Sequence, residues 1–243
     1  MTITTALIVA LGGFAGGFIS GLSGFGLALV SLGLWLHVLE PIPAVITALC
    51  CSVASQLSTV RAVLHVMEPR RVLPFVLPGL LGIPLGQMAL GAIPVDLFRL
   101  VMGVILITFS GALLLWRRPI GTDWGGRAAD AMVGFLGGVL GGFAALLGSM
   151  PTFWAIVRGW GKDEKRSVFQ AFNLAILGTS LAVAVLAGRF DRQLTLVVAL
   201  AVPATLIGAN LGVRTYQRLS DRSYNDAVLG LLVLTGLSLL IAV

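Results

Sequence analysis

A serine-rich and glycine-rich stretch interrupts the first apolar run of the chain. It reads Ser20-Gly21-Leu22-Ser23-Gly24-Phe25-Gly26 and lies inside a run from residue 3 to residue 36. As one helix, that run would be about 51 Å long, well beyond the roughly 30 Å hydrocarbon core of a bilayer. Unwound backbone in a bilayer is tolerated only where protein buries it or where it lines a cavity. We therefore expect a break here that offers backbone N–H groups and a serine hydroxyl to a ligand.

A second interruption stands in the other half of the sequence. Phe14-Ala15-Gly16-Gly17 recurs as Phe135-Leu136-Gly137-Gly138, and this copy leads to Gly148-Ser149-Met150-Pro151. Ser149 can cap a half-helix and Pro151 can begin one. The exposed N–H groups at the start of a half-helix carry partial positive charge, and glycine lets a ligand approach them closely. Both interruptions therefore favour binding of an anion.

Neutral polar side chains follow each interruption within apolar segments. The first group is Thr47, Ser52, Ser55, Gln56, Ser58 and Thr59, and the second is Gln170, Asn173, Thr179 and Ser180. Most can donate hydrogen bonds to an oxyanion, although serine and threonine also bond to their own helix or to packed neighbours. The predicted substrate site is Gly21, Ser23, Gly24, Phe25, Gly26, Thr47, Gln56, Gly148, Ser149, Pro151, Gln170 and Asn173.

Charged residues are scarce within the apolar segments. No Asp or Glu lies at the centre of one, and His37 and His65 lie at segment ends, so the coupling ion stays open, with a proton as one possibility. The basic cluster beside the second break either anchors topology or draws anions toward the site; it comprises Arg158, Lys162, Lys165 and Arg166. No metal site or cofactor is expected.

Composition places the chain in the membrane. Hydrophobic residues make up 58% of the 243 residues and charged residues 11%, whereas an average soluble domain is about 25% charged. The net charge of +6 is spread over short clusters between apolar segments, which favours a role in topology over nucleic-acid binding. Cys50 and Cys51 are adjacent in an apolar segment, so we interpret them as packing residues.

The spacing of segments predicts an all-α polytopic membrane protein with two inverted repeats. Each repeat has a broken or re-entrant first helical hairpin and three transmembrane helices, over residues 1–116 and 128–243, with a cytoplasmic linker at 117–127. Gly82 and Gly86 match Gly208 and Gly212, which supports a duplication. If both broken segments turn back, Lys and Arg divide 13 to 3 between the two sides; two short spans in each broken segment give the same count. Both termini are then predicted to be periplasmic.

The whole plan resembles the sulfite exporter family, the TauE/SafE-type anion permeases. The resemblance rests on the Gly-rich stretches at 16–26 and 137–142, on Ala44-Val45-Ile46-Thr47, and on the late Gly-x-x-x-Gly pairs at 82–86 and 208–212. It implies a secondary transporter that moves sulfite or an organosulfonate across the bacterial inner membrane by alternating access. The oligomeric state stays open.

An enzymatic alternative rests on one short motif. Gly21-Leu22-Ser23-Gly24 fits the Gly-x-Ser-Gly pattern of rhomboid intramembrane proteases, in which a histidine activates the serine. His37 and His65 are the histidines available to Ser23. Loss of reporter cleavage in a Ser23 variant would distinguish this protease from a transporter.

Overall fold

The described part of the chain is helical throughout. The computed structural model describes residues 2–23, 26–59, 69–115, 125–145, 154, 158, 160 and 162–216. Over these ranges it contains no strand, in agreement with the predicted all-α class. Its helices are α1 (Ile3–Ser23), α2 (Leu27–Trp35), α3 (Pro41–Thr59), α4 (Pro69–Ala92), α5 (Val95–Leu115), α6 (Gly126–Ala144), α8 (Lys162–Leu186) and α9 (Arg192–Tyr216).

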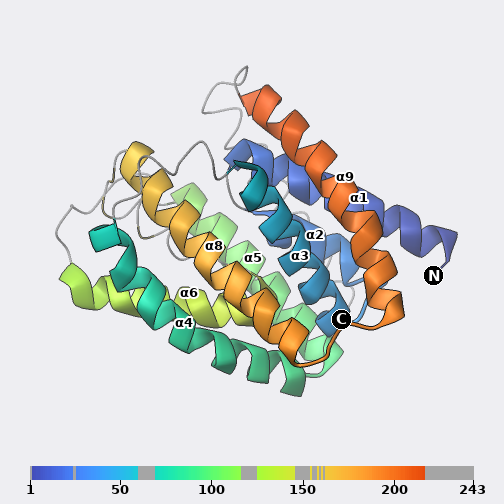
Figure 1. Ribbon diagram of the computed structural model, residues 1–243, viewed down its shortest axis with the longest axis horizontal. Coiled ribbons are helices and arrows are strands. Elements are labelled where there is room, and N and C mark those ends of the chain that lie inside the picture. Colours follow the sequence, from blue (N-terminus) through green and yellow to red (C-terminus); the bar gives the residue numbers. More distant parts are fainter. Residues whose placement is uncertain are drawn as a thin grey trace.

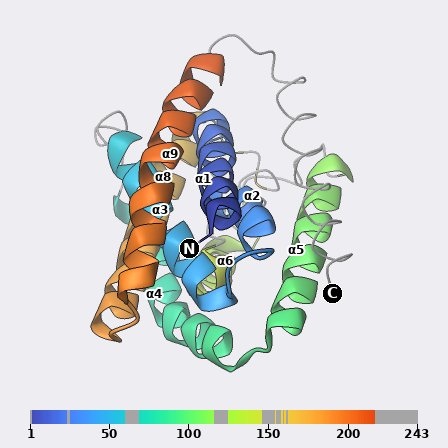
Figure 2. The ribbon, with the colours of Figure 1, turned by 90° about the vertical axis from the view of Figure 1, so that its right-hand side faces the viewer.

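Three pairs of helices make up most of the molecule. Figure 1 shows α3 and α8 crossing its middle, with α1 and α9 packed together on one side and α4 and α6 on the other. Helix α5 stands at the edge of the bundle in Figure 2. It contacts α6 through Phe98 and Phe143, whose ring centroids are 5.0 Å apart.

The first apolar run is interrupted where the sequence predicts a break. Helix α1 ends at Ser23 and α2 begins at Leu27, after Gly26 with a left-handed φ of 91°. Helix α2 then turns back along α1, because the Ser31 hydroxyl donates to the Gly12 carbonyl (2.9 Å) and the Trp35 indole to the Val9 carbonyl (3.1 Å). The nine residues of α2 extend only about 14 Å, too short to cross a bilayer alone.

Helix α6 ends slightly before the second predicted break. Its last residue is Ala144, and Ala145 adopts a left-handed φ of 56° while donating its N–H to the Gly141 carbonyl (3.0 Å). The left-handed conformation usually falls to glycine, so the sequence carries no signal for a helix end at an alanine. The predicted break at 148–151 lies outside the described residues.

Glycines bring α1 and α9 into backbone contact. A Cβ atom added to Gly13, Gly17 or Gly21 would collide with the backbone or side chain of α9 near Ala201, Thr205 and Ala209. In return, a Cβ on Gly208 or Gly212 would collide with the backbone of α1. Small residues at four-residue spacing allow this approach, which is a common way for helices to associate in membranes.

Helices α4 and α6 meet through a second set of glycines. A Cβ on Gly134, Gly138 or Gly142 would collide with the backbone of α4 at Phe75, Gly79 or Ile83. These α6 glycines lie 121 positions after Gly13, Gly17 and Gly21, and their α4 partners lie 126 positions before the α9 partners. The two contacts therefore use matching positions of the two halves.

Apolar side chains cover much of the outer surface. On α4 the exposed residues recur along one face at Leu73, Leu77, Leu81, Leu85 and Met88. Four helices of the described chain are long and apolar enough to cross a membrane: α1, α3, α4 and α9. An exposed apolar face on long helices is the expected surface of a polytopic membrane protein.

Candidate functional site

Buried polar residues gather on the two central helices. Helices α3 and α8 pack against each other, and Ile46 and Ala184 belong to one core cluster at one end of this contact. The buried polar residues of the pair are Thr47, Ser52, Ser55 and Gln56 on α3, and Asn173 and Ser180 on α8. The structure thus brings three predicted site residues, Thr47, Gln56 and Asn173, onto one helix pair.

Two of these residues have polar atoms without a partner. Asn173 Oδ1 and Ser180 Oγ are buried and make no hydrogen bond within the described part of the chain. Rotation of the Asn173 amide would present its N–H₂ group in place of the oxygen. A buried polar atom without a partner costs about 1–3 kcal/mol, so both residues favour a polar ligand in this region.

The Thr47 hydroxyl is engaged within its own helix. It donates to the Pro43 carbonyl at 2.8 Å, the bond to the preceding turn that buried threonines often make. Its single hydrogen is then unavailable to an anion. Ser55 has a different environment, because its Oγ lies 3.5 Å from Ser20 Oγ and so connects α3 to the end of α1.

Gln87 is a buried polar residue that the sequence reading did not single out. It lies on α4 and donates from Nε2 to the Ser180 carbonyl at 2.9 Å, which connects α4 to the C-terminal part of α8. Gln87 could have been predicted by the criterion that applies to Gln170 and Asn173. All three are amides within an apolar span, where such a group needs a hydrogen-bond partner.

The other predicted site residues divide into three groups. Gly26 caps α2, whereas Gly21 packs against Ala209 of α9, so a substitution at Gly21 would act first on helix packing. Ser23 ends α1 and Gln170 lies within α8, but the described structure does not include their side chains. Gly24, Phe25, Gly148, Ser149 and Pro151 lie outside the described residues.

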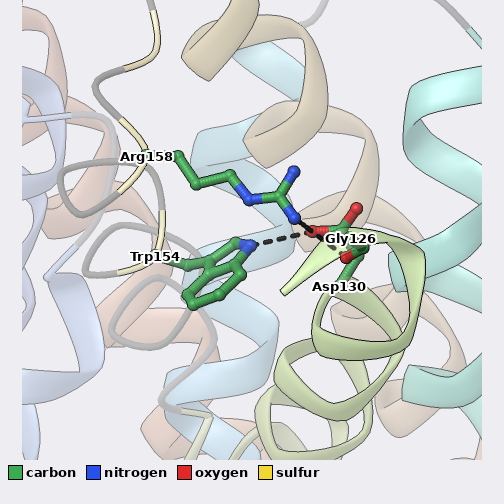
Figure 3. Close-up of polar contacts among 4 residues, drawn as sticks. All are labelled: Gly126, Asp130, Trp154 and Arg158. Carbon is green, nitrogen blue, oxygen red and sulfur yellow. Dashed lines mark hydrogen bonds and ion pairs between the residues drawn. The ribbon is translucent and has the colours of Figure 1, made fainter. Parts of the chain in front are cut away.

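A buried ion pair lies at the start of α6 (Figure 3). Arg158 Nη2 is 3.2 Å from Asp130 Oδ1 and donates to the Gly126 carbonyl at 2.8 Å. The Trp154 indole donates to the same carboxylate oxygen at 2.8 Å, and the Arg158 guanidinium lies 5.0 Å from the centre of the indole ring. Asp130 and Arg158 are each 8% exposed. Arg158 is therefore buried and paired with Asp130. The two roles predicted for the basic cluster, a topology anchor or a surface that attracts anions, both assume an exposed side chain.

The first half holds a neutral arrangement at matching positions. Trp35 donates from its indole to the carbonyl of Val9, and Asp130 lies 121 positions after Val9. The Leu39 N–H donates to the Trp35 carbonyl (2.7 Å), just as the Arg158 N–H donates to the Trp154 carbonyl (2.9 Å). The sequence did not predict either tryptophan hydrogen bond. The sequence pattern that could have indicated these contacts is the similar spacing in the two halves: Trp35 lies 26 residues after Val9, and Trp154 lies 24 residues after Asp130.

Comparison with known proteins identifies the family. The family model described as "Sulfite exporter TauE/SafE" matches residues 9–239, nearly the whole chain. Neither the curated proteins nor the solved structures gave a match. The family consists of transporters and lends no support to the protease alternative. The chain belongs to the sulfite exporter TauE/SafE family.

Proposed function

We propose that this chain is a secondary transporter that moves sulfite or a small organosulfonate across the bacterial inner membrane. The observation that carries the proposal is the family match over residues 9–239. The long apolar helices and the unpartnered polar atoms of α8 support it, since a carrier needs a polar site inside an apolar body.

The matching glycine contacts support an inverted repeat. Helix α1 of the first half packs on α9 of the second, and α6 of the second half packs on α4 of the first. A two-fold rotation that exchanges the halves would convert one contact into the other. The return of α2 along α1 supports a re-entrant hairpin, which gives the 13 to 3 division of Lys and Arg and periplasmic termini.

The same contacts indicate which parts move together during alternating access. Rocking residues 1–116 as one body against residues 128–243 would separate the backbones of α1 and α9 and those of α4 and α6. We infer instead that each glycine-packed pair moves as a unit and that the central helices α3 and α8 shift against each other. The anion binds beside α3 and α8, near the two breaks.

Flux through reconstituted protein tests the function. Proteoliposomes would receive labelled sulfite, with unlabelled sulfite, sulfoacetate, taurine and sulfate as competitors. We expect saturable uptake that sulfite or one organosulfonate suppresses. No flux of any of these anions above that of protein-free vesicles would refute the proposal.

Two substitutions on the central helices locate the site. Asn173→Leu removes a buried amide with an unpartnered oxygen, and we expect KM to rise about tenfold or more. The matched control is Thr47→Val, whose lost hydroxyl donates only to Pro43, so KM should change little. A large KM effect at Thr47 with none at Asn173 would place the site elsewhere.

Cross-linking tests the proposed moving parts. In a background with Cys50→Ala and Cys51→Ala, a disulfide between Ile46→Cys and Ala184→Cys would join α3 to α8, and we expect it to stop flux reversibly. A disulfide between Ile46→Cys and Leu194→Cys, from the same core cluster, would join α3 to α9 and serves as the control. Equal loss from both would contradict movement between α3 and α8.

A further inference from the structure

The Arg158 guanidinium uses only part of its hydrogen-bonding capacity. Both of its polar contacts in the described structure, to Gly126 and Asp130, are made by Nη2. Nε is buried and has no hydrogen-bond partner among the described residues. A guanidinium has five N–H donors in a planar fork, so Arg158 can still accept an oxyanion on the donors that remain.

The charge at this position is not required by the fold. The first half forms the same turn with Leu39 in place of Arg158, and its tryptophan donates to the backbone carbonyl of Val9 where Trp154 donates to the carboxylate of Asp130. Burial of an ion pair involves a large desolvation cost, and well-packed apolar residues often replace such a pair without loss of stability. A charged pair in one half alone therefore points to a function that the scaffold does not explain.

Asp130 is placed to act as a resting counter-ion. The Trp154 indole holds its Oδ1 at 2.8 Å, independently of the arginine, while Arg158 Nη2 approaches the same oxygen at 3.2 Å. When no anion is present, the carboxylate compensates the buried positive charge. An arriving oxyanion would share the guanidinium with it, and the Trp154 hydrogen bond would keep the carboxylate in place.

We propose that Arg158 binds the transported anion directly, through Nε and the free guanidinium hydrogens, and that Asp130 is its counter-ion in the empty state. The ligand class is a sulfur oxyanion, sulfite or a sulfonate group, whose oxygens match the planar fork. This inference rests on the proposed transport function, and it adds a fixed positive charge at the start of α6 to the neutral donors of α3 and α8.

The decisive variant replaces the ion pair with the two apolar residues that the first half has at the matching positions. Asp130→Val combined with Arg158→Leu places at these positions the residues found at Val9 and Leu39. Sulfite would be titrated into purified wild-type and variant protein, with the melting temperature and the Kd as readouts. We expect the double variant to melt near the wild-type temperature, with sulfite affinity lower by tenfold or more. Wild-type affinity in the folded double variant would show a purely structural pair and overturn the proposal.

A conservative variant decides the question if the double variant does not fold. Arg158→Lys keeps a positive charge beside Asp130 but lacks the Nε–H and the planar fork. We expect near-normal melting and at least a tenfold increase in Kd and KM for sulfite; unchanged binding by Arg158→Lys would overturn the proposal. Wild-type flux in the same preparation tests transport itself, so failure of this inference and failure of the proposed function give different results.

Discussion

The two halves make matching glycine contacts, but around their tryptophans the described residues differ in charge. In the first half, Trp35 donates to a backbone carbonyl beside apolar Leu39; in the second, Trp154 donates to the carboxylate of Asp130, which also pairs with Arg158. The glycine contacts of α1 with α9 and of α4 with α6 hardly differ. The shared features thus belong to helix packing, and the difference is a charged pair present in the second half where the first half has apolar residues.

The largest expected effect tests the shared packing. Gly17→Ala and Gly138→Ala each introduce a Cβ into the backbone of the facing helix, at Thr205 and Gly79 respectively. We expect each to destabilise the protein by about 3 kcal/mol or more, because a backbone cannot yield as a side chain can. Melting temperature in detergent is the measurement. Gly178→Ala is the control, since a Cβ added there would meet no atom within 4 Å, and its melting temperature should be unchanged or higher.

The next largest loss of stability is expected at the ion pair of the second half, and it is compared with the matching apolar position of the first half. Asp130→Asn leaves the buried Arg158 without its counter-charge, and we expect a loss of about 3 kcal/mol in the free energy of unfolding. Val9→Ala at the matching position removes only two methyl groups from a buried side chain and should cost about 1–2 kcal/mol. If Asp130→Asn melts like wild type, the ion pair contributes nothing to the fold.

Substitution of the two tryptophans should lower the free energy of unfolding by smaller amounts. Trp154→Phe removes a hydrogen bond to a carboxylate, worth about 1.5–3 kcal/mol, whereas Trp35→Phe removes one to a neutral carbonyl, worth about 1 kcal/mol. Comparison of the two unfolding free energies checks this order. A larger loss at Trp35 would mean that the indole bonds are not what distinguishes the halves.

The smallest expected effect is a gain in stability. Ala145→Gly relieves a left-handed residue at the end of α6, and we expect about 1 kcal/mol of stabilisation. Gly26→Ala, at the left-handed cap of α2, should give a loss of similar size. Thermal melting of the two variants in parallel measures both, and shifts of the same sign would argue against this conformational explanation.

Much of the architecture could be predicted because membranes impose simple rules on length and composition. The break before Leu27 followed from a run too long for one span, and the late glycines of α4 and α9 were found by their spacing. The partners of those glycines could not be predicted, because the exchange of helices between the halves is a tertiary property. Gly21 is an example, because its contact with Ala209 of α9 could not be predicted from the glycine pattern.

The sequence predicted neutral polar residues within apolar segments, and it indicated only some of the buried polar residues that the structure describes. Asn173 was singled out because an amide is costly within a span, and Gln56 was singled out as a neutral polar residue after the first break; the structure buries both. The Asp130 and Arg158 pair was missed because each residue lies toward the end of an apolar segment, where a charge normally reaches water or a headgroup. Only their approach across 28 positions of sequence reveals a buried pair.

Counterflow of labelled sulfite tests the central claim most directly. Vesicles that contain the protein would be loaded with unlabelled sulfite and diluted into a trace of labelled sulfite. A carrier that alternates between two faces should accumulate the label transiently above its external concentration. Label that never exceeds the level of protein-free vesicles, with protein that remains folded and monodisperse, would contradict the assignment of this chain as a sulfur-anion carrier.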